Sequence, residues 1–281
     1  MKDLVIKLWW SISTVLVICI ILGMFGFVFI NGYEGISLKF LIESPSGTPI
    51  GSEGGIYNCI IGSLYFTTLS TFIGLLFSIC VSAYLAFYNR NKRIKSIIRL
   101  VIGVIGGIPS IVLGLFGYGF LVVYMKLGIS IIAGSIVLGT LIFPFMTLRF
   151  EKIFGEVDKL LFYSSLSLGI DKTYTFFKII LPITYKEITR TICLGASFSM
   201  GATAPILLTG AVYYAKVPRS IFSPAMALPL QLYGLISEGI CVENAYKTAL
   251  VLIGILLCLN FIPIILMRED YYGKYFRNKK S

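Results

Sequence analysis

The chain has 281 residues, of which 57% are apolar and 13% charged, and its mean hydropathy is +0.90. An average soluble domain carries about 25% charged residues, so this composition excludes the two soluble domains that the length alone would permit. The net charge of +11 would suit a nucleic-acid-binding protein, but segments that flank apolar runs account for it.

Six apolar runs follow one another along the chain without strand-like alternation. Each meets or approaches the ~20 residues that a helix needs to cross a bilayer. Because the backbone in lipid must satisfy its own hydrogen bonds, such runs are expected to be helices. The sequence therefore predicts an all-α polytopic membrane protein with six transmembrane helices, at residues 8–30, 60–88, 97–125, 128–148, 188–214 and 249–267.

The first run follows Lys2 and Lys7, as the core of a secretory signal would. Its apolar stretch is longer than the roughly 7–15 residues of a signal core, and no small-residue cleavage site follows. We therefore expect a retained first span. The next segment, 31–58, contains Pro45, Pro49 and many Gly and Ser, which predicts an irregular external loop.

Basic residues are concentrated on one side of the predicted bundle. If the amino terminus is inside, 19 of the 24 Lys and Arg lie in cytoplasmic segments, at 1–7, 90–99, 149–190 and 268–281. An excess of Lys and Arg in cytoplasmic loops is the positive-inside pattern. Both termini are therefore predicted to be cytoplasmic, and the net positive charge lies on that face.

The cytoplasmic segment between the fourth and fifth spans has helix-ending and helix-starting signals. A short helix up to Leu168 would end at Gly169, which adopts positive φ easily. Asp171 would cap a second helix that Pro182 interrupts. These signals predict a helix–turn–helix elbow at about 157–182; an ordinary basic loop is the alternative.

The external segment 215–246 contains three prolines and a moderately apolar stretch at 226–236. That stretch is too short to span a bilayer. It predicts a re-entrant or surface segment.

Several kinds of chemistry are excluded by composition. The chain has no histidine, which excludes His-based acid–base chemistry. Its six cysteines form no C-x-x-C pair, so we expect them to be small buried apolar residues. No G-x-x-x-x-G-K-[ST] loop occurs, so the chain lacks this means of cradling nucleotide phosphates. No catalytic residue, metal site or cofactor is predicted. A membrane-embedded enzyme would need intramembrane acids, histidines or cysteine clusters, and the spans hold almost none.

The elbow resembles the loop E-A-A-x3-G-x9-I-x-L-P of ABC importer permeases. Gly169 is followed after nine residues by Ile179-Ile180-Leu181-Pro182, Ser164 and Ser165 stand for the small pair, and Tyr163 replaces the glutamate. In that family the loop forms a coupling helix seated in a cleft of the ATPase. The resemblance implies a type I ABC importer permease fold, with an ATPase contact formed by Tyr163, Ser164, Ser165, Leu168, Gly169 and Asp171.

Four further motifs, the first made of two short segments, resemble those of phosphate ABC importer permeases, the PstA type, and occur in the same order. They are GGI and GSLY at 54–56 and 62–65, GIPSIVLGLFGY at 107–118, TAPILLT at 203–209 and PAMALPL at 224–230. The resemblance covers the chain from about 54 to 267. One departure concerns the fifth span, where the family carries R-x-x-G-E-T-A-P and this chain has Phe198 and Ala202 in place of both charges.

The resemblance places the substrate pathway along the fifth span. Candidate contacts for an oxyanion are the hydroxyls of Ser197, Ser199, Thr203 and Ser110 and the guanidinium of Arg190. Around Gly201 the backbone can open toward a cavity. The alternative for each hydroxyl is a bond to a helix carbonyl, and for Arg190 a position at the cytoplasmic interface.

By this resemblance the chain is a multi-pass subunit of a bacterial inner (plasma) membrane importer, most closely one for inorganic phosphate. It would work with a homologous permease (PstC-like), two ATPase subunits (PstB-like) that bind ATP and Mg²⁺, and an external phosphate-binding protein (PstS-like), and with no nucleic acid. Its regions would be a first span and external loop (1–57), a permease core (58–267) and a basic cytoplasmic tail (268–281). The missing charge pair leaves open a different oxyanion or a neutral solute, and a membrane-embedded regulatory subunit is a further alternative.

Overall fold

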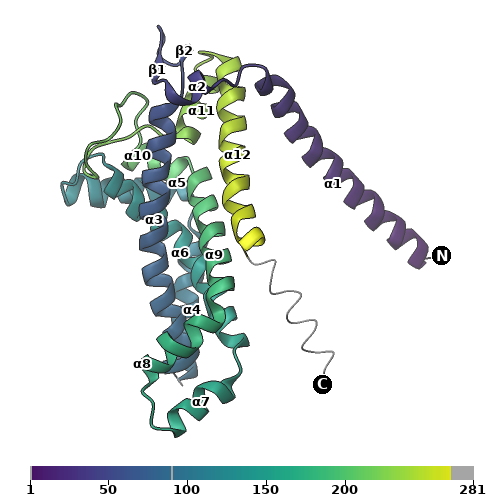
Figure 1. Cartoon of the computed structure of the whole chain (residues 1–281), viewed down its shortest axis with the longest axis vertical. Coiled ribbons are helices and arrows are strands. Elements are labelled where there is room, and N and C mark those ends of the chain that lie inside the picture. Colours follow the sequence, from purple (N-terminus) through teal and green to yellow (C-terminus); the bar gives the residue numbers. More distant parts are fainter. Residues whose placement is uncertain (1, 90, 267–281) are drawn as a thin grey trace. The chain divides into compact units, whose positions relative to one another are not determined.

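The computed structural model describes residues 2–89 and 91–266 and is mostly helical (Figure 1). The predicted basic tail, 268–281, lies outside the described residues. The α-helices are α1 (Lys2–Tyr33), α2 (Leu38–Ile42), α3 (Tyr57–Ala83), α4 (Lys92–Gly107), α5 (Ser110–Gly117), α6 (Ile131–Glu156), α7 (Lys159–Ser167), α8 (Lys172–Thr175), α9 (Leu181–Gly201), α10 (Ala204–Thr209), α11 (Leu228–Ser237) and α12 (Val242–Leu266). Three π-helical segments, η1 (Tyr84–Tyr88), η2 (Tyr118–Tyr124) and η3 (Phe176–Ile180), and two short strands, β1 (Pro45–Ser46) and β2 (Glu53–Gly54), complete the fold.

Within the described residues, 4 helices are long and apolar enough to cross a membrane unaided: Ile6–Tyr33, Tyr57–Tyr88, Ile131–Glu156 and Val242–Ile265. A fifth candidate is the pair Lys92–Gly107 and Ser110–Tyr124, which is bent by 95°. The prediction of several apolar spanning helices is confirmed. Two of the six predicted spans, 97–125 and 188–214, are each divided into two helices.

The first break divides the predicted span 97–125 at Ile108-Pro109. A proline pushes the preceding residue out of the helical region, and it has no N–H to donate. Ile108 accordingly has φ −71° and ψ 127°, and α5 starts afresh at Ser110. The apolar run is therefore two helices at a sharp angle, because hydropathy does not register a backbone bend.

The second break divides the predicted span 188–214. Helix α9 ends at Gly201, Ala202 is extended with φ −79° and ψ 115°, and α10 begins at Ala204. Pro205 lies in the first turn of α10, where its missing N–H costs nothing. The backbone opening expected around Gly201 is present, and it ends the long helix.

The described chain divides into two compact units, which we describe separately. Unit 1 consists of the residues up to Tyr57 together with Gln231–Ile253. Unit 2 consists of Asn58–Leu230 and the described residues from Gly254 onward.

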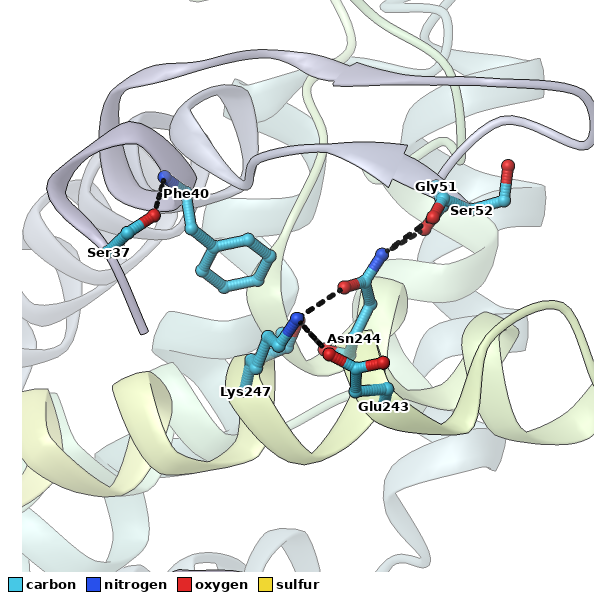
Figure 2. Close-up of polar contacts among 8 residues, drawn as sticks. Ser37, Phe40, Gly51, Ser52, Glu243, Asn244 and Lys247 are labelled. Atoms are coloured by element: carbon cyan, nitrogen blue, oxygen red, sulfur yellow. Dashed lines mark hydrogen bonds and ion pairs between the residues drawn. The ribbon is translucent and has the colours of Figure 1, made fainter. Parts of the chain in front are cut away.

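In unit 1, the segment expected to be irregular, 31–58, contains regular structure. It holds α2 and an antiparallel hairpin in which Pro45 pairs with Gly54. Asn244 at the start of α12 donates hydrogen bonds from Nδ2 to the carbonyl oxygens of Gly51 (2.9 Å) and Ser52 (3.0 Å) (Figure 2). Because these hydrogen bonds come from a residue far away in sequence, composition alone did not predict regular structure in this loop.

Lys247, one turn further along α12, fixes the other side of the same loop. Its ammonium lies 2.6 Å from the Glu243 carboxylate and 5.7 Å from the centre of the Phe40 ring in α2 (Figure 2). A Cβ at Gly35 would collide with the Lys247 side chain. A larger residue at this position would force the end of the lysine side chain to move.

In unit 2, helix α6 packs against α4, α5, α9 and α10. It also meets α3 closely: a Cβ at Gly139 would lie 3.1 Å from the carbonyl oxygen of Ser70, and one at Gly74 would lie 2.9 Å from Ile142. Small residues allow helix backbones in a membrane to approach this closely. Helices α3 and α6 therefore pack closely against each other in unit 2.

Candidate functional site

The elbow lies at one end of unit 2, where α7 and α8 are neighbours (Figure 1). Helix α7 starts at its cap Asp158 and ends just before Gly169, whose φ is +77°. The Gly169 N–H donates to the Leu166 carbonyl at 3.0 Å, and Asp171 caps α8 by accepting from the Thr173 N–H at 2.9 Å. The predicted helix–turn–helix is therefore present.

The Asp171 carboxyl is an acceptor in its charged form. Hydrogen bonds, first from the backbone N–H of Thr173 and then from its side chain, lower the pKa of Asp171 from its ordinary value. The cap is thus ionised at neutral pH.

The prediction that Pro182 interrupts the second helix is wrong. Helix α8 continues through η3 into α9, and Pro182 lies in the first turn of α9. The Leu181 N–H reaches back five residues, to the Phe176 carbonyl. This wider π turn accommodates a proline that a regular α-helix would not, so one continuous helical element joins the elbow to the fifth predicted span.

Four phenylalanine rings connect the elbow to η1 and to the end of α6. We call Phe87, Phe154, Phe162 and Phe176 the aromatic cluster. Phe162 of α7 stacks on Phe87 of η1 at 4.8 Å between ring centres, and Phe176 of η3 meets Phe154 of α6 edge-on at 5.4 Å. Such contacts stabilise by roughly 0.5–1.5 kcal/mol each beyond burial. Through these rings the elbow packs against η1 and the end of α6.

The outer face of the elbow is apolar and uncovered. Leu168 is 80% exposed and Tyr163 49%, while Ser165 is 5% exposed and bonds back to the Leu161 carbonyl at 2.6 Å. Ser164, Gly169 and Asp171 are also exposed. Five of the six predicted coupling residues are thus exposed, and Ser165 packs inward.

A second feature of unit 2 is a cavity of about 320 Å³ at the break between α9 and α10. Ser110, at the start of α5, contributes to its wall because α5 and α10 pack tightly: a Cβ at Gly114 would lie 3.0 Å from the Cα of Pro205. The lining residues are Ser110, Leu141, Ser197, Phe198, Gly201, Ala202, Thr203 and Pro205.

Three of the five predicted pathway residues therefore share this cavity. Ser197 donates to the Cys193 carbonyl (2.9 Å) and accepts from Nδ2 of Asn260 on α12 (3.0 Å), which leaves one lone pair. Within the described chain, the hydroxyls of Ser110 and Thr203 make no hydrogen bond and are available to a solute.

The other two predicted pathway residues lie elsewhere. Ser199 is 2% exposed and its hydroxyl lies 2.6 Å from that of Ser70 on α3, inside a helix contact. Arg190 is on the surface of α9 and bonds Glu187 at 2.7 Å. Neither lines the cavity.

The two positions that carry charges in the resembling family, Phe198 and Ala202, both line the cavity, so none of the described residues in its wall is charged. Sequence reasoning missed Asn260, Ser70 and the aromatic cluster, since each acts through a partner far away in sequence. Asn260 in the middle of an apolar span was the one available signal, because a polar residue in a membrane helix needs a partner.

Comparisons with known proteins relate this chain to membrane transport proteins. Residues 74–269 match the family model described as binding-protein-dependent transport system inner membrane component. A Methanocaldococcus jannaschii protein named probable phosphate transport system permease protein PstA is 32% identical over 78% of this chain and 78% of its own. A Bacillus subtilis probable ABC transporter permease, YqgI, is 25% identical over 82% of this chain and 81% of its own.

Solved structures show the same fold. A chain of the inward-facing MetNI methionine ABC transporter superposes with a TM-score of 0.61 at 17% identity, covering 74% of this chain and 92% of that one. A bacterial ABC transporter that imports the acidic polysaccharide alginate gives 0.53 at 15% identity, covering 93% of this chain and 99% of that one. The chain therefore belongs to the binding-protein-dependent transport system inner-membrane component family and is a multi-pass membrane permease subunit of an ABC importer, in which a pair of permeases works with an ATPase and a substrate-binding protein.

Proposed function

We propose that this permease is the PstA-type half of an importer for inorganic phosphate in a bacterial-type inner (plasma) membrane. Its permease core, 58–267, would cross the membrane five times and the first span once more, with both termini cytoplasmic. In this arrangement α4, α5 and η2 form the bent third span, and α9 with α10 forms the broken fifth span. A PstC-like permease, two PstB-like ATPases and a PstS-like binding protein would complete the complex.

One observation carries the proposal: two segments that resemble phosphate-permease signatures, 107–118 and 203–209, meet at the hydroxyl-lined cavity. They are separated by more than eighty residues in sequence, yet Gly114 of the first touches Pro205 of the second. The M. jannaschii relative, and a Mycobacterium bovis relative that is 30% identical over 75% of this chain and 71% of its own, both carry PstA names.

The cavity's hydroxyls are suited to a protonated oxyanion. Ser110 and Thr203 can donate to phosphate oxygens, and the remaining lone pair of Ser197 can accept from a P–O–H group. Sulfate has no proton to give at neutral pH, so this arrangement favours phosphate over sulfate. Because no described residue in the wall is charged, binding would be weak, as a pathway requires.

Coupling would run through the elbow and the aromatic cluster. The ATPase would hold the exposed face of α7, including Tyr163 and Leu168. Closure of the ATPases on ATP would shift the elbow, and the aromatic cluster would pass that shift to α3 and α6. The change of access follows from the different affinities of the elbow for the two ATPase states.

The uncharged wall favours one competing function, import of a neutral solute through the same architecture. Uptake by the complex reconstituted in proteoliposomes distinguishes the two. Labelled phosphate should accumulate with ATP, and unlabelled phosphate, but neither sulfate nor molybdate, should compete. Competition by sulfate or molybdate at similar concentration, or no phosphate uptake by a complex that hydrolyses ATP, would refute the phosphate assignment.

A further inference from the structure

Beside the elbow, unit 2 holds a cavity of about 250 Å³ to which no role has yet been given. Its walls come from η1, the start of α4, the end of α6 and α7. The lining residues are Ala86, Phe87, Asn89, Lys95, Phe154, Gly155, Phe162 and Tyr163. Aromatic rings form much of the wall, and Asn89, Lys95 and Tyr163 bring polar groups.

Asn89 is the first of two donors without an acceptor. The side chain is 8% exposed, and its Oδ1 accepts from the Asn91 N–H at 2.8 Å. That bond fixes the amide orientation, because the opposite orientation would set two donors against each other. Nδ2 is then buried without a hydrogen-bond partner in the described chain. A buried amide donor left unpaired is unfavourable by about 1–3 kcal/mol, so a group that accepts from it would be stabilised here.

Lys95 is the second donor. It lies in the first turns of α4 and is half-buried. Among the described residues, no carboxylate lies within ion-pair distance of its ammonium, although Arg99, one turn further, is paired with Glu151 at 2.6 Å. Among the described residues, the cavity therefore combines an amide N–H group without an acceptor and an ammonium without a carboxylate, and Tyr163 also lines it.

We propose that this cavity receives an Asp or Glu side chain of the ATPase subunit. A carboxylate would accept from Asn89 Nδ2 and pair with Lys95, and its methylene stem would lie against the Phe87 and Phe162 rings. Charge complementarity selects an acidic partner, and Phe162 with Tyr163 makes the cavity continuous with the exposed face of α7. The inference rests on the proposed function, since it takes that face as the ATPase contact.

Zero-length cross-linking tests the contact directly. Carbodiimide joins an ammonium to a carboxylate only when the two touch, and mass spectrometry then identifies both residues. In the complete detergent-solubilised complex we expect Lys95 joined to an acidic residue of the ATPase. Lys92, one turn earlier on α4, is exposed and does not line the cavity, so it serves as the matched control.

Two substitutions measure the effect on assembly. Lys95→Gln removes the cation, and Asn89→Asp keeps the acceptor for the Asn91 N–H but replaces the amide donor by a second carboxylate. Each is expected to weaken ATPase binding about tenfold or more, whereas Lys92→Gln should leave it unchanged. Binding is measured by titrating the ATPase onto permease in nanodiscs of uncharged lipid.

Unchanged ATPase affinity in both variants, or cross-links to the ATPase from Lys92 but not Lys95, would overturn the proposal. Protection of Lys95 from amine labelling by anionic lipid alone, without ATPase, would assign the cavity to a lipid headgroup and would overturn it too. Phosphate uptake by the unmodified complex is recorded in parallel. If the cross-link forms and phosphate is not transported, the proposed substrate fails and the carboxylate contact stands.

Discussion

Replacing Gly169 by alanine perturbs the elbow through its backbone alone. Gly169 has φ +77°, and a Cβ built there would meet nothing within 4 Å. No side chain has to move, so the whole effect is the cost of holding an L-residue in the left-handed region. That cost is roughly 1–2 kcal/mol.

A strain of this size lowers the population of the correctly folded elbow and does not unfold the protein. One or two kcal/mol corresponds to a factor of about 5–30 in an equilibrium ratio. The strain is relieved if the last turn of α7 opens, which breaks the bonds from the Gly169 N–H to Leu166 and from the Ile170 N–H to Ser165. The elbow would then transmit ATPase closure less faithfully.

The assay is the number of solute molecules imported per ATP hydrolysed in proteoliposomes. We expect Gly169→Ala to lower this ratio several-fold while ATP hydrolysis continues. Gly169→Pro should uncouple hydrolysis from uptake, because proline fixes φ near −65° and removes the N–H. Gly169→Asn should recover part of the ratio, because asparagine adopts positive φ more readily.

Gly128 provides a matched control, since its φ is +68° and a Cβ there also meets nothing within 4 Å. Gly128→Ala carries the same backbone strain away from α7 and α8 and should keep the normal ratio. Normal coupling in both Gly169→Ala and Gly169→Pro would refute the role of the elbow. An equal fall in Gly128→Ala would show that the effect is general strain.

Three further outcomes are expected. Ser199→Ala should lower stability by about 1 kcal/mol, because it removes the buried bond to Ser70, and should leave uptake unchanged; uptake lost at an unchanged thermal midpoint would contradict this. Asn244→Leu should leave two loop carbonyls unpaired, at about 1–3 kcal/mol, so hydrogen exchange at 45–54 should accelerate; exchange equal to wild type would argue against the anchor. The lowered pKa of Asp171 means that its cap stabilises α8 above the unfolded-chain pKa of about 3.9 and is lost as pH falls through the folded value. Amide hydrogen exchange of α8, corrected for the intrinsic rate at each pH, should therefore rise only below about pH 4. In Asp171→Asn this pH dependence should disappear.

Much of the elbow was predictable because its signals are local. Gly169 ends a helix and Asp171 starts one within a few residues of chain, and both effects depend on backbone geometry that neighbouring residues set. The effect of Pro182 was predicted wrongly because the π-helical segment η3, just before it, accommodates a residue that has no N–H to donate. That segment packs against Phe154 through Phe176. Local proline chemistry does not reveal that packing.

The sequence predicted that hydroxyl groups would line the cavity, but it did not predict which residues would supply them. Ser110, Ser197 and Thr203 do meet, but Ser199, two residues from Ser197, is turned into the contact with Ser70. On a helix, residues two apart face different directions. Which hydroxyl reaches a solute therefore depends on where α3 and α6 lie around α9.

By itself the sequence determined that the chain is a helical membrane protein with a capped elbow, because hydropathy, charge bias and cap residues act over one helix or one turn. Only the tertiary structure decided where two spans break, which hydroxyls share a cavity, and that among the described residues Asn89 Nδ2 has no acceptor and Lys95 no carboxylate partner. Those features depend on distances between segments far apart along the chain, and such distances are set by side-chain packing that no local pattern encodes.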